Sequence, residues 1–174
     1  MESARWGAVT ALTPLRRGWT PWLRIVFALG STTTIFVRPL LQMRVIALGR
    51  WTLVRRDERP PALLFETNWT GAWESYIDDF ARIMPMQWRS IWGGAEGFPG
   101  PKPVTGLLQY IAAHDHKADH FYTGYREGAT THTVANALAL QPRFERFLRD
   151  VDGAEPDEFA RRWEGFLTDV QGQL

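Results

Sequence analysis

Stretches in which apolar and polar residues alternate divide this chain into predicted strands. Such a period of two is typical of a half-buried strand, because successive side chains point to opposite faces of a sheet. In the second stretch, Trp51 or its neighbours are expected on the uncovered face of that sheet. The predicted strands are Trp6–Leu15, Arg44–Arg55, Ala62–Asn68, Gln87–Gly93 and His120–Tyr125.

Between these strands, apolar residues recur at three- and four-residue spacing, which predicts helices with one buried stripe. Thr70 is expected to cap the helix that contains Trp73 and Tyr76, and Pro85 to end it. Pro142 is expected to interrupt a later helix. The predicted helices are Thr20–Leu29, Trp73–Met84, Val104–Ile111, Thr133–Val151 and a last one opened by Pro156.

The order strand, helix, strand, strand, helix, strand predicts an α+β protein with a ferredoxin-like antiparallel sheet. Helices would cover one face of that sheet. The other face must then be solvated, covered by a second subunit or used to hold a ligand. We therefore expect a ferredoxin-like domain over residues 1–152 and an appended C-terminal helix over 153–174, docked on the domain or on a partner subunit.

Composition narrows the classes of function. The 174 residues carry 20 basic and 19 acidic side chains, and this net charge of +1 leaves no electrostatic footprint for nucleic acid. The absence of cysteine removes disulfides and thiolate ligands. Neither a secretory signal nor a membrane span is expected, so a cytoplasmic protein is predicted. Nine tryptophans suit a core, an interface or a flat apolar ligand.

Polar side chains in mid-strand are the candidate catalytic residues. Alternation over Ala62–Asn68 places Glu66 and Asn68 on the face opposite Leu63 and Phe65. A glutamate near histidine and arginine could serve as a general base, while Asn68 and an arginine orient a carbonyl or stabilise negative charge. The alternative is a structural ion pair in a dimer core. The predicted set is Glu66, His120, Arg50 and Asn68, with Arg89 and Tyr122 beside them.

The run LLFETNWTGAWESYIDDF, followed by Trp92 and the GFPG at residues 97–100, resembles bacterial ferredoxin-like proteins of the dimeric α+β barrel superfamily. Relatives of that superfamily include dye-decolorising haem peroxidases, chlorite dismutases and antibiotic-biosynthesis monooxygenases. The resemblance implies a homodimer that closes its two sheets into a barrel. Related sequences often carry a histidine where this chain has Ala47, so any role of that histidine is not transferred.

Three functions follow. The first is an enzyme without a tightly bound cofactor, such as a monooxygenase, cyclase or isomerase of secondary metabolism. It would act on a flat aromatic or polyketide-like substrate in a barrel pocket lined by Trp69, Trp88 and Trp92, unless these tryptophans belong to the core. The second is a haem-binding, peroxidase-like protein whose axial ligand is His120, then His116 or His114 in order of preference. The third is a non-catalytic dimeric binding module.

Overall fold

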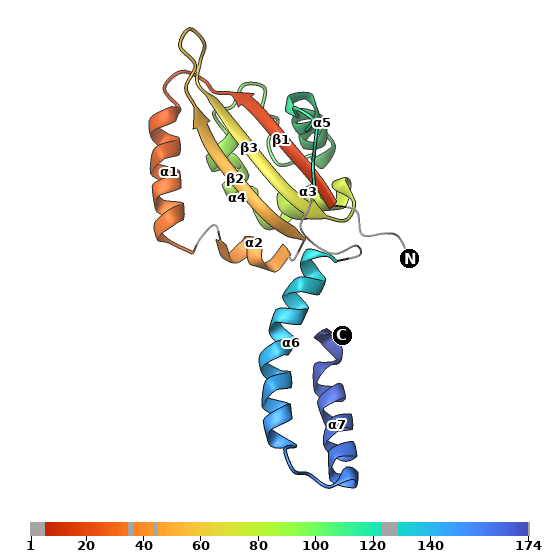
Figure 1. Cartoon of the computed structure of the whole chain (residues 1–174). Coiled ribbons are helices and arrows are strands. Elements are labelled where there is room, and N and C mark those ends of the chain that lie inside the picture. The colour runs from red at the N-terminus through yellow and green to blue at the C-terminus, as the bar shows by residue number, and fades with distance from the viewer. Residues whose placement is uncertain (1–5, 35–36, 44, 123–128, 174) are drawn as a thin grey trace. The chain divides into compact units, whose positions relative to one another are not determined.

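The computed structural model describes residues 6–34, 37–43, 45–122 and 129–173. The chain divides into two compact units, Met1–Gly128 and Ala129–Leu174. Figure 1 shows a sheet with helices in the first unit and a helical hairpin in the second. The domain boundary expected after residue 152 falls inside the second unit, between its two helices. None of the described helices is both long enough and apolar enough to cross a membrane.

Three strands form the sheet of the first unit, in the order β1-β3-β2 with every pair antiparallel. The strands are β1 (Trp6–Pro14), β2 (Ile46–Val54) and β3 (Ala62–Thr70). Glu66 on the central strand lies between Thr10 on β1 and Arg50 on β2. A β-bulge lies between Ile46 and Leu48. The first three predicted strands are confirmed within the described residues, which exclude Arg44.

Helices in this unit follow the predicted apolar stripes, with two differences. The helices are α1 (Thr20–Thr32), α2 (Val37–Met43), α3 (Trp73–Ile83), α4 (Pro85–Trp92) and α5 (Val104–His114). In Figure 1, α3 and α4 lie behind the sheet, α5 lies by the β1 edge, and α1 lies beside the β2 edge. The sequence analysis missed α2. The predicted cap at Thr70 is wrong, because Thr70 ends β3 and Ala72 precedes α3.

The predicted strand Gln87–Gly93 is wrong, because these residues form most of α4. Pro85 ends α3 and also opens the next helix, since proline fits the first helical position, where no N–H bond is needed. Trp88, Ile91 and Trp92 have helical spacing and are all buried. Their burial against the core selects the helix over the alternating pattern that the same residues also satisfy.

The last predicted strand is not present at His120–Phe121 or Tyr122, and the rest of His120–Tyr125 lies outside the described residues. The outer edge of β1 is instead contacted directly after α5. Asp115 forms an antiparallel bridge with Ala11. The N–H of His116 donates to the Thr10 carbonyl over 2.8 Å, and the N–H of Thr10 donates to the Asp115 carboxylate over 3.0 Å.

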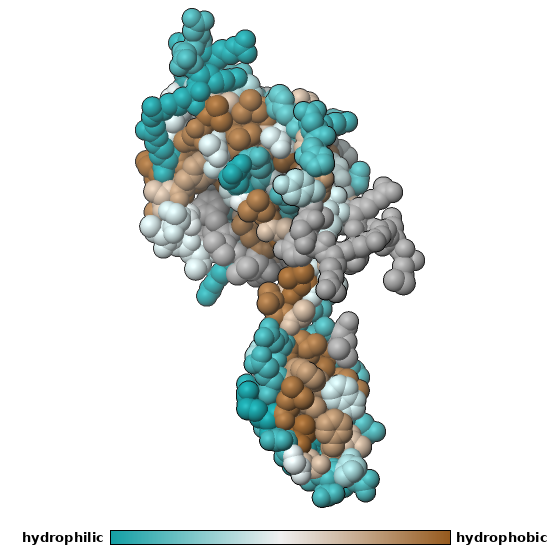
Figure 2. Space-filling view, in the orientation of Figure 1, coloured by the Kyte–Doolittle hydropathy of each residue, from teal (hydrophilic) through white to brown (hydrophobic). Residues whose placement is uncertain are grey.

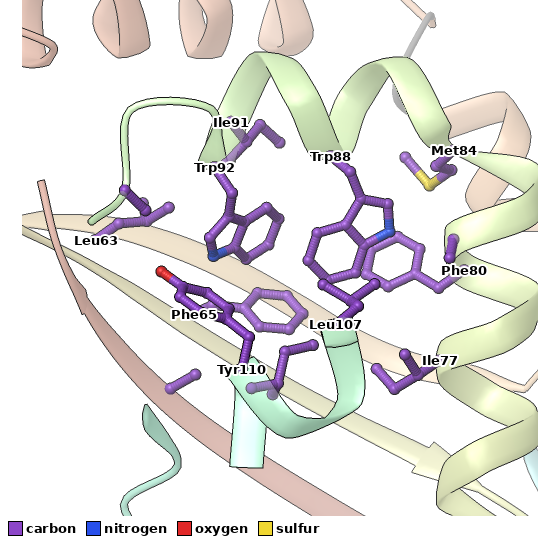
Figure 3. Packing of buried hydrophobic residues seen from close by; sticks show 14 of the residues in the cluster. Leu63, Phe65, Ile77, Phe80, Met84, Trp88, Ile91, Trp92, Leu107 and Tyr110 are labelled. Carbon is purple, nitrogen blue, oxygen red and sulfur yellow. The ribbon is translucent and has the colours of Figure 1, made fainter. Parts of the chain in front are cut away.

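The core lies between the sheet and helices α3, α4 and α5 (Figure 3). Phe65 on β3 meets Trp92 edge-on at a ring-centroid distance of 5.0 Å, and Trp88 lies 4.4 Å from Trp92. Trp51 also belongs to this side, since its ring stacks on Phe65 at 5.3 Å. Of Trp51 and its neighbours, the uncovered face therefore carries a neighbour, Arg50, and not Trp51 itself. Aromatic burial of this extent is the main source of stability in the first unit.

The second unit is a helical hairpin of α6 (Thr131–Asp150) and α7 (Pro156–Val170), followed by a short 3-10 helix, Gln171–Gln173. Thr130 caps α6 through a reciprocal capping box with Thr133. The predicted interruption at Pro142 is wrong, because α6 continues through it. Pro142 is exposed, so water can bond the backbone group that the missing N–H leaves free. The predicted helix opened by Pro156 is confirmed.

Candidate functional site

The uncovered face of the sheet carries a row of polar side chains across its centre. On β3, Leu63, Phe65 and Thr67 are at most 1% exposed, whereas Glu66 and Asn68 are half-buried on the other face. The predicted alternation of β3 is therefore confirmed. The antiparallel register places Arg50 beside Glu66, and Asn68 lies two residues further along β3, on the same face.

Arg50 and Glu66 form the one ion pair between neighbouring strands in the part of the chain that the structure describes. The Arg50 Nε donates to Glu66 Oε2 over 2.8 Å, and Arg50 Nη2 contacts the same oxygen. The side chains are 63% and 28% exposed, so water screens the pair strongly. This geometry orients the Glu66 carboxylate, but it leaves the pair accessible rather than enclosed in a pocket.

We expect Glu66→Gln to change the free energy of unfolding by less than about 1 kcal/mol, because exposed ion pairs contribute little. Urea denaturation of the variant and of the parent protein measures this difference. Arg50→Gln is the matched control, since it removes the other partner of the same pair. A loss of several kcal/mol in either variant would contradict this and would indicate that the pair is buried by a partner.

Among the described residues, the predicted histidines make no hydrogen bond or ion pair with Arg50, Glu66 or Asn68. The N–H of His116 does bond the carbonyl of Thr10, the strand partner of Glu66. His114 Nδ1 bonds the Tyr110 carbonyl over 2.8 Å, and its ring packs 4.4 Å from the Tyr110 ring. His120 is exposed, and its ring lies 5.5 Å from that of Tyr122. Among the described residues, no three His, Cys, Asp or Glu side chains are placed to hold a metal ion.

The residues predicted to bind a substrate are dispersed. Trp69, Trp88 and Trp92 are at most 5% exposed and belong to the core. Tyr122 is 82% exposed, and Arg89 is an exposed residue of α4, which covers the opposite face of the sheet from Glu66. Glu66, Arg50 and Asn68 are thus the members of the predicted site that share one face of the sheet.

A cavity of about 340 Å³ lies on the helix-covered side of β2. Its volume falls within the range of small-molecule sites. Gly49 and Trp51, two residues apart on β2, face it together, and the other walls come from α1, α2 and α4. The lining residues are Val26, Phe27, Gly30, Leu40, Gly49, Trp51 and Ile91.

The chemistry of this cavity is apolar. None of the described residues that line it is titratable, and the Trp51 and Phe27 rings supply aromatic surface. Gly49 leaves room beside Trp51, since a Cβ added there would meet only the Trp51 ring edge at 3.9 Å. Sequence reasoning missed the cavity. A glycine inside a strand of large residues was the available signal, because it leaves space where a side chain would pack.

Comparison of the chain with protein-family models, with curated proteins and with solved structures found no match. The candidate sites therefore rest on their own geometry. The cavity can hold a flat apolar molecule without a charged group, while the Arg50–Glu66 pair can orient or polarise a small polar group. The two sites lie on opposite faces of the sheet, so their residues do not combine into one pocket.

Proposed function

We propose that this protein binds a small, flat, apolar molecule in the cavity between α1, α2, β2 and α4. The observation that supports this most directly is the apolar lining of the 340 Å³ cavity, with Trp51 as its aromatic wall. Flat apolar ligands pack well on aromatic side chains, and removal of their surface from water provides the main driving force. The proposal is for binding, because the described lining residues supply apolar and aromatic surface.

A side chain that fills the cavity tests the proposed binding. Gly49→Leu places a side chain beside Trp51, where the backbone leaves room. We expect this variant to bind 2-naphthol, a flat aromatic probe, at least about tenfold more weakly than the parent protein, a loss of about 1.4 kcal/mol. Saturation-transfer NMR and tryptophan fluorescence titration both measure the affinity.

Thr52→Leu is the matched control for this experiment. It adds a leucine to the same strand, but Thr52 is paired with Leu64 on the uncovered face. Binding should therefore be retained. Equal affinity in the parent and in Gly49→Leu would contradict the proposal, as would the absence of binding by the parent protein.

A second candidate is an enzyme on the uncovered face, and the row of Arg50, Glu66 and Asn68 favours it. We infer a ferredoxin-like fold, in agreement with the strand order β1-β3-β2 and with the bridge between Asp115 and Ala11 at the edge where a fourth strand would pair. A homodimer that closes over this face would enclose Glu66 and remove its solvent screening. Loss of turnover in Glu66→Gln on an identified substrate, with unchanged folding, would support this candidate.

A further inference from the structure

The helical hairpin α6–α7 leaves apolar side chains partly exposed, some of them at the margin of its own aromatic core. Within Ala129–Leu174, the described side chains that are less than 10% exposed are Phe147, Val151 and Val170. Leu138, Phe144, Leu148 and Phe159 are between 39% and 65% exposed. Figure 2 shows apolar residues gathered along both helices on the face toward the viewer. A two-helix unit of this size buries too little surface to be well stabilised alone.

Charge is separated from this apolar face. A groove of about 410 Å³ between α6 and α7 has apolar residues in its lining, and its charged lining residues are Arg143, Arg146, Asp150, Arg162 and Asp169. Ala137, Phe144 and Leu148 recur on α6 at spacings of seven and four residues, so they share one side of that helix. The arginines of α6 that line the groove project from a different side of the same helix.

We infer that the apolar face of α6–α7 binds the same face of a second copy of this chain, so that two hairpins form a four-helix bundle. A two-fold interface requires a patch that is complementary to itself. Apolar side chains can meet their own copies across a two-fold axis without bringing like charges together. Bundles of this kind pack such stripes against one another around a common core.

The available area is sufficient for such a contact. Helices of 20 and 15 residues are about 30 and 22 Å long and together about 20 Å wide, which gives a face on the order of 500 Å² per copy. Two copies would bury about 1,000 Å², the lower limit for a specific interface.

The charge of the hairpin argues against an anionic lipid surface as the occupant. Residues 129–174 contain five arginines, no lysine and eight acidic residues, a net charge of −3. Anionic membranes attract basic segments and repel acidic ones. An apolar protein surface is therefore a better occupant of this face than an anionic membrane. A second copy of the chain provides such a surface and is present at the same concentration.

Ala137 and Ala139 provide a matched pair for the test. Both are exposed alanines of α6, and a separation of two residues places them on nearly opposite sides of the helix. In the full chain, we expect Ala137→Glu to halve the mass measured by analytical ultracentrifugation, with the helical circular dichroism unchanged. Ala139→Glu should leave the mass at the parent value.

Three results would overturn the inference. The parent protein could be a monomer of 20.0 kDa at micromolar concentration, or Ala137→Glu could leave the mass of the parent unchanged. The third is an equal decrease in mass in Ala137→Glu and Ala139→Glu. Because the chain has no cysteine, single cysteines test the same surface without a charge that could perturb folding. Ala137→Cys should react with a maleimide several-fold more slowly than Ala139→Cys. Equal rates would contradict burial of this face.

Discussion

Replacement of Trp92 by alanine is expected to lower the free energy of unfolding of the first unit by about 3–5 kcal/mol. Trp92 is 1% exposed and contacts the rings of Trp51, Phe65 and Trp88. Its removal opens a cavity where side chains of β2, β3 and α4 meet, and neighbours attached to a sheet can collapse into it only in part. Urea denaturation followed by circular dichroism measures the loss.

Trp22→Ala is the control for this prediction. Trp22 is 45% exposed, and its indole N–H donates to the Ser90 carbonyl over 2.9 Å. Half of its surface is already in water, so its truncation should cost about 1–2 kcal/mol. If Trp22→Ala destabilised the protein as much as Trp92→Ala, the placement of Trp92 at the centre of the core would be wrong.

Alkaline pH is expected to destabilise the first unit steeply. Tyr76 is 2% exposed, and its burial raises its pKa well above the ordinary value. Thr67 Oγ1 donates to the Leu48 carbonyl, so it accepts the Tyr76 hydroxyl hydrogen over 2.8 Å. Burial also raises the pKa of Tyr110 to about 12, and its hydroxyl donates to the Glu96 carbonyl over 3.1 Å.

Proton binding decides whether a rise in pH stabilises or destabilises the folded protein. In the unfolded chain both phenols ionise near pH 10, whereas the folded protein keeps them neutral at that pH. Their contribution to stability is therefore fully present below about pH 10 and is lost as the pH rises through about 12. Urea midpoints at pH 8, 10 and 11 should decrease progressively once pH 10 is passed.

Tyr76→Phe separates this effect from general alkaline unfolding. The variant loses the hydrogen bond to Thr67 and should be about 1 kcal/mol less stable at pH 8. It also loses one ionisable group, so its stability should decrease less between pH 10 and 11 than that of the parent protein. An identical pH dependence in both proteins would show that Tyr76 does not ionise on unfolding in this range.

Local periodicity predicted the structure correctly where the pattern fitted only one type of element. Over Ala62–Thr70 the alternation separated Leu63, Phe65 and Thr67 from Glu66 and Asn68, and the burial of these residues confirms it. Strand geometry forces that result, because a period of two has no alternative once the residues form a strand. The spacing of the apolar residues in α3, α5 and α7 was similarly unambiguous.

Periodicity gave a wrong prediction where the same residues fitted both a strand and a helix. It also could not predict which face of a strand meets the core. Residues 87–93 satisfy both alternation and helical spacing, and their contacts with Phe65 and Phe80 decide for the helix. Alternation in β2 correctly groups Gly49 with Trp51, but it does not say which group meets the core. Pairing of Trp51 with Phe65 on β3 makes that choice.

By itself, the sequence determined that the chain is a mixed α and β protein with an antiparallel sheet, a buried face on β3 and a C-terminal helix after Pro156. These features depend on neighbours a few residues apart. Only the tertiary structure brought Glu66 to Arg50 and assembled a cavity from α1, α2, β2 and α4. Strand register and helix packing depend on contacts between residues far apart in the chain, which local periodicity does not encode.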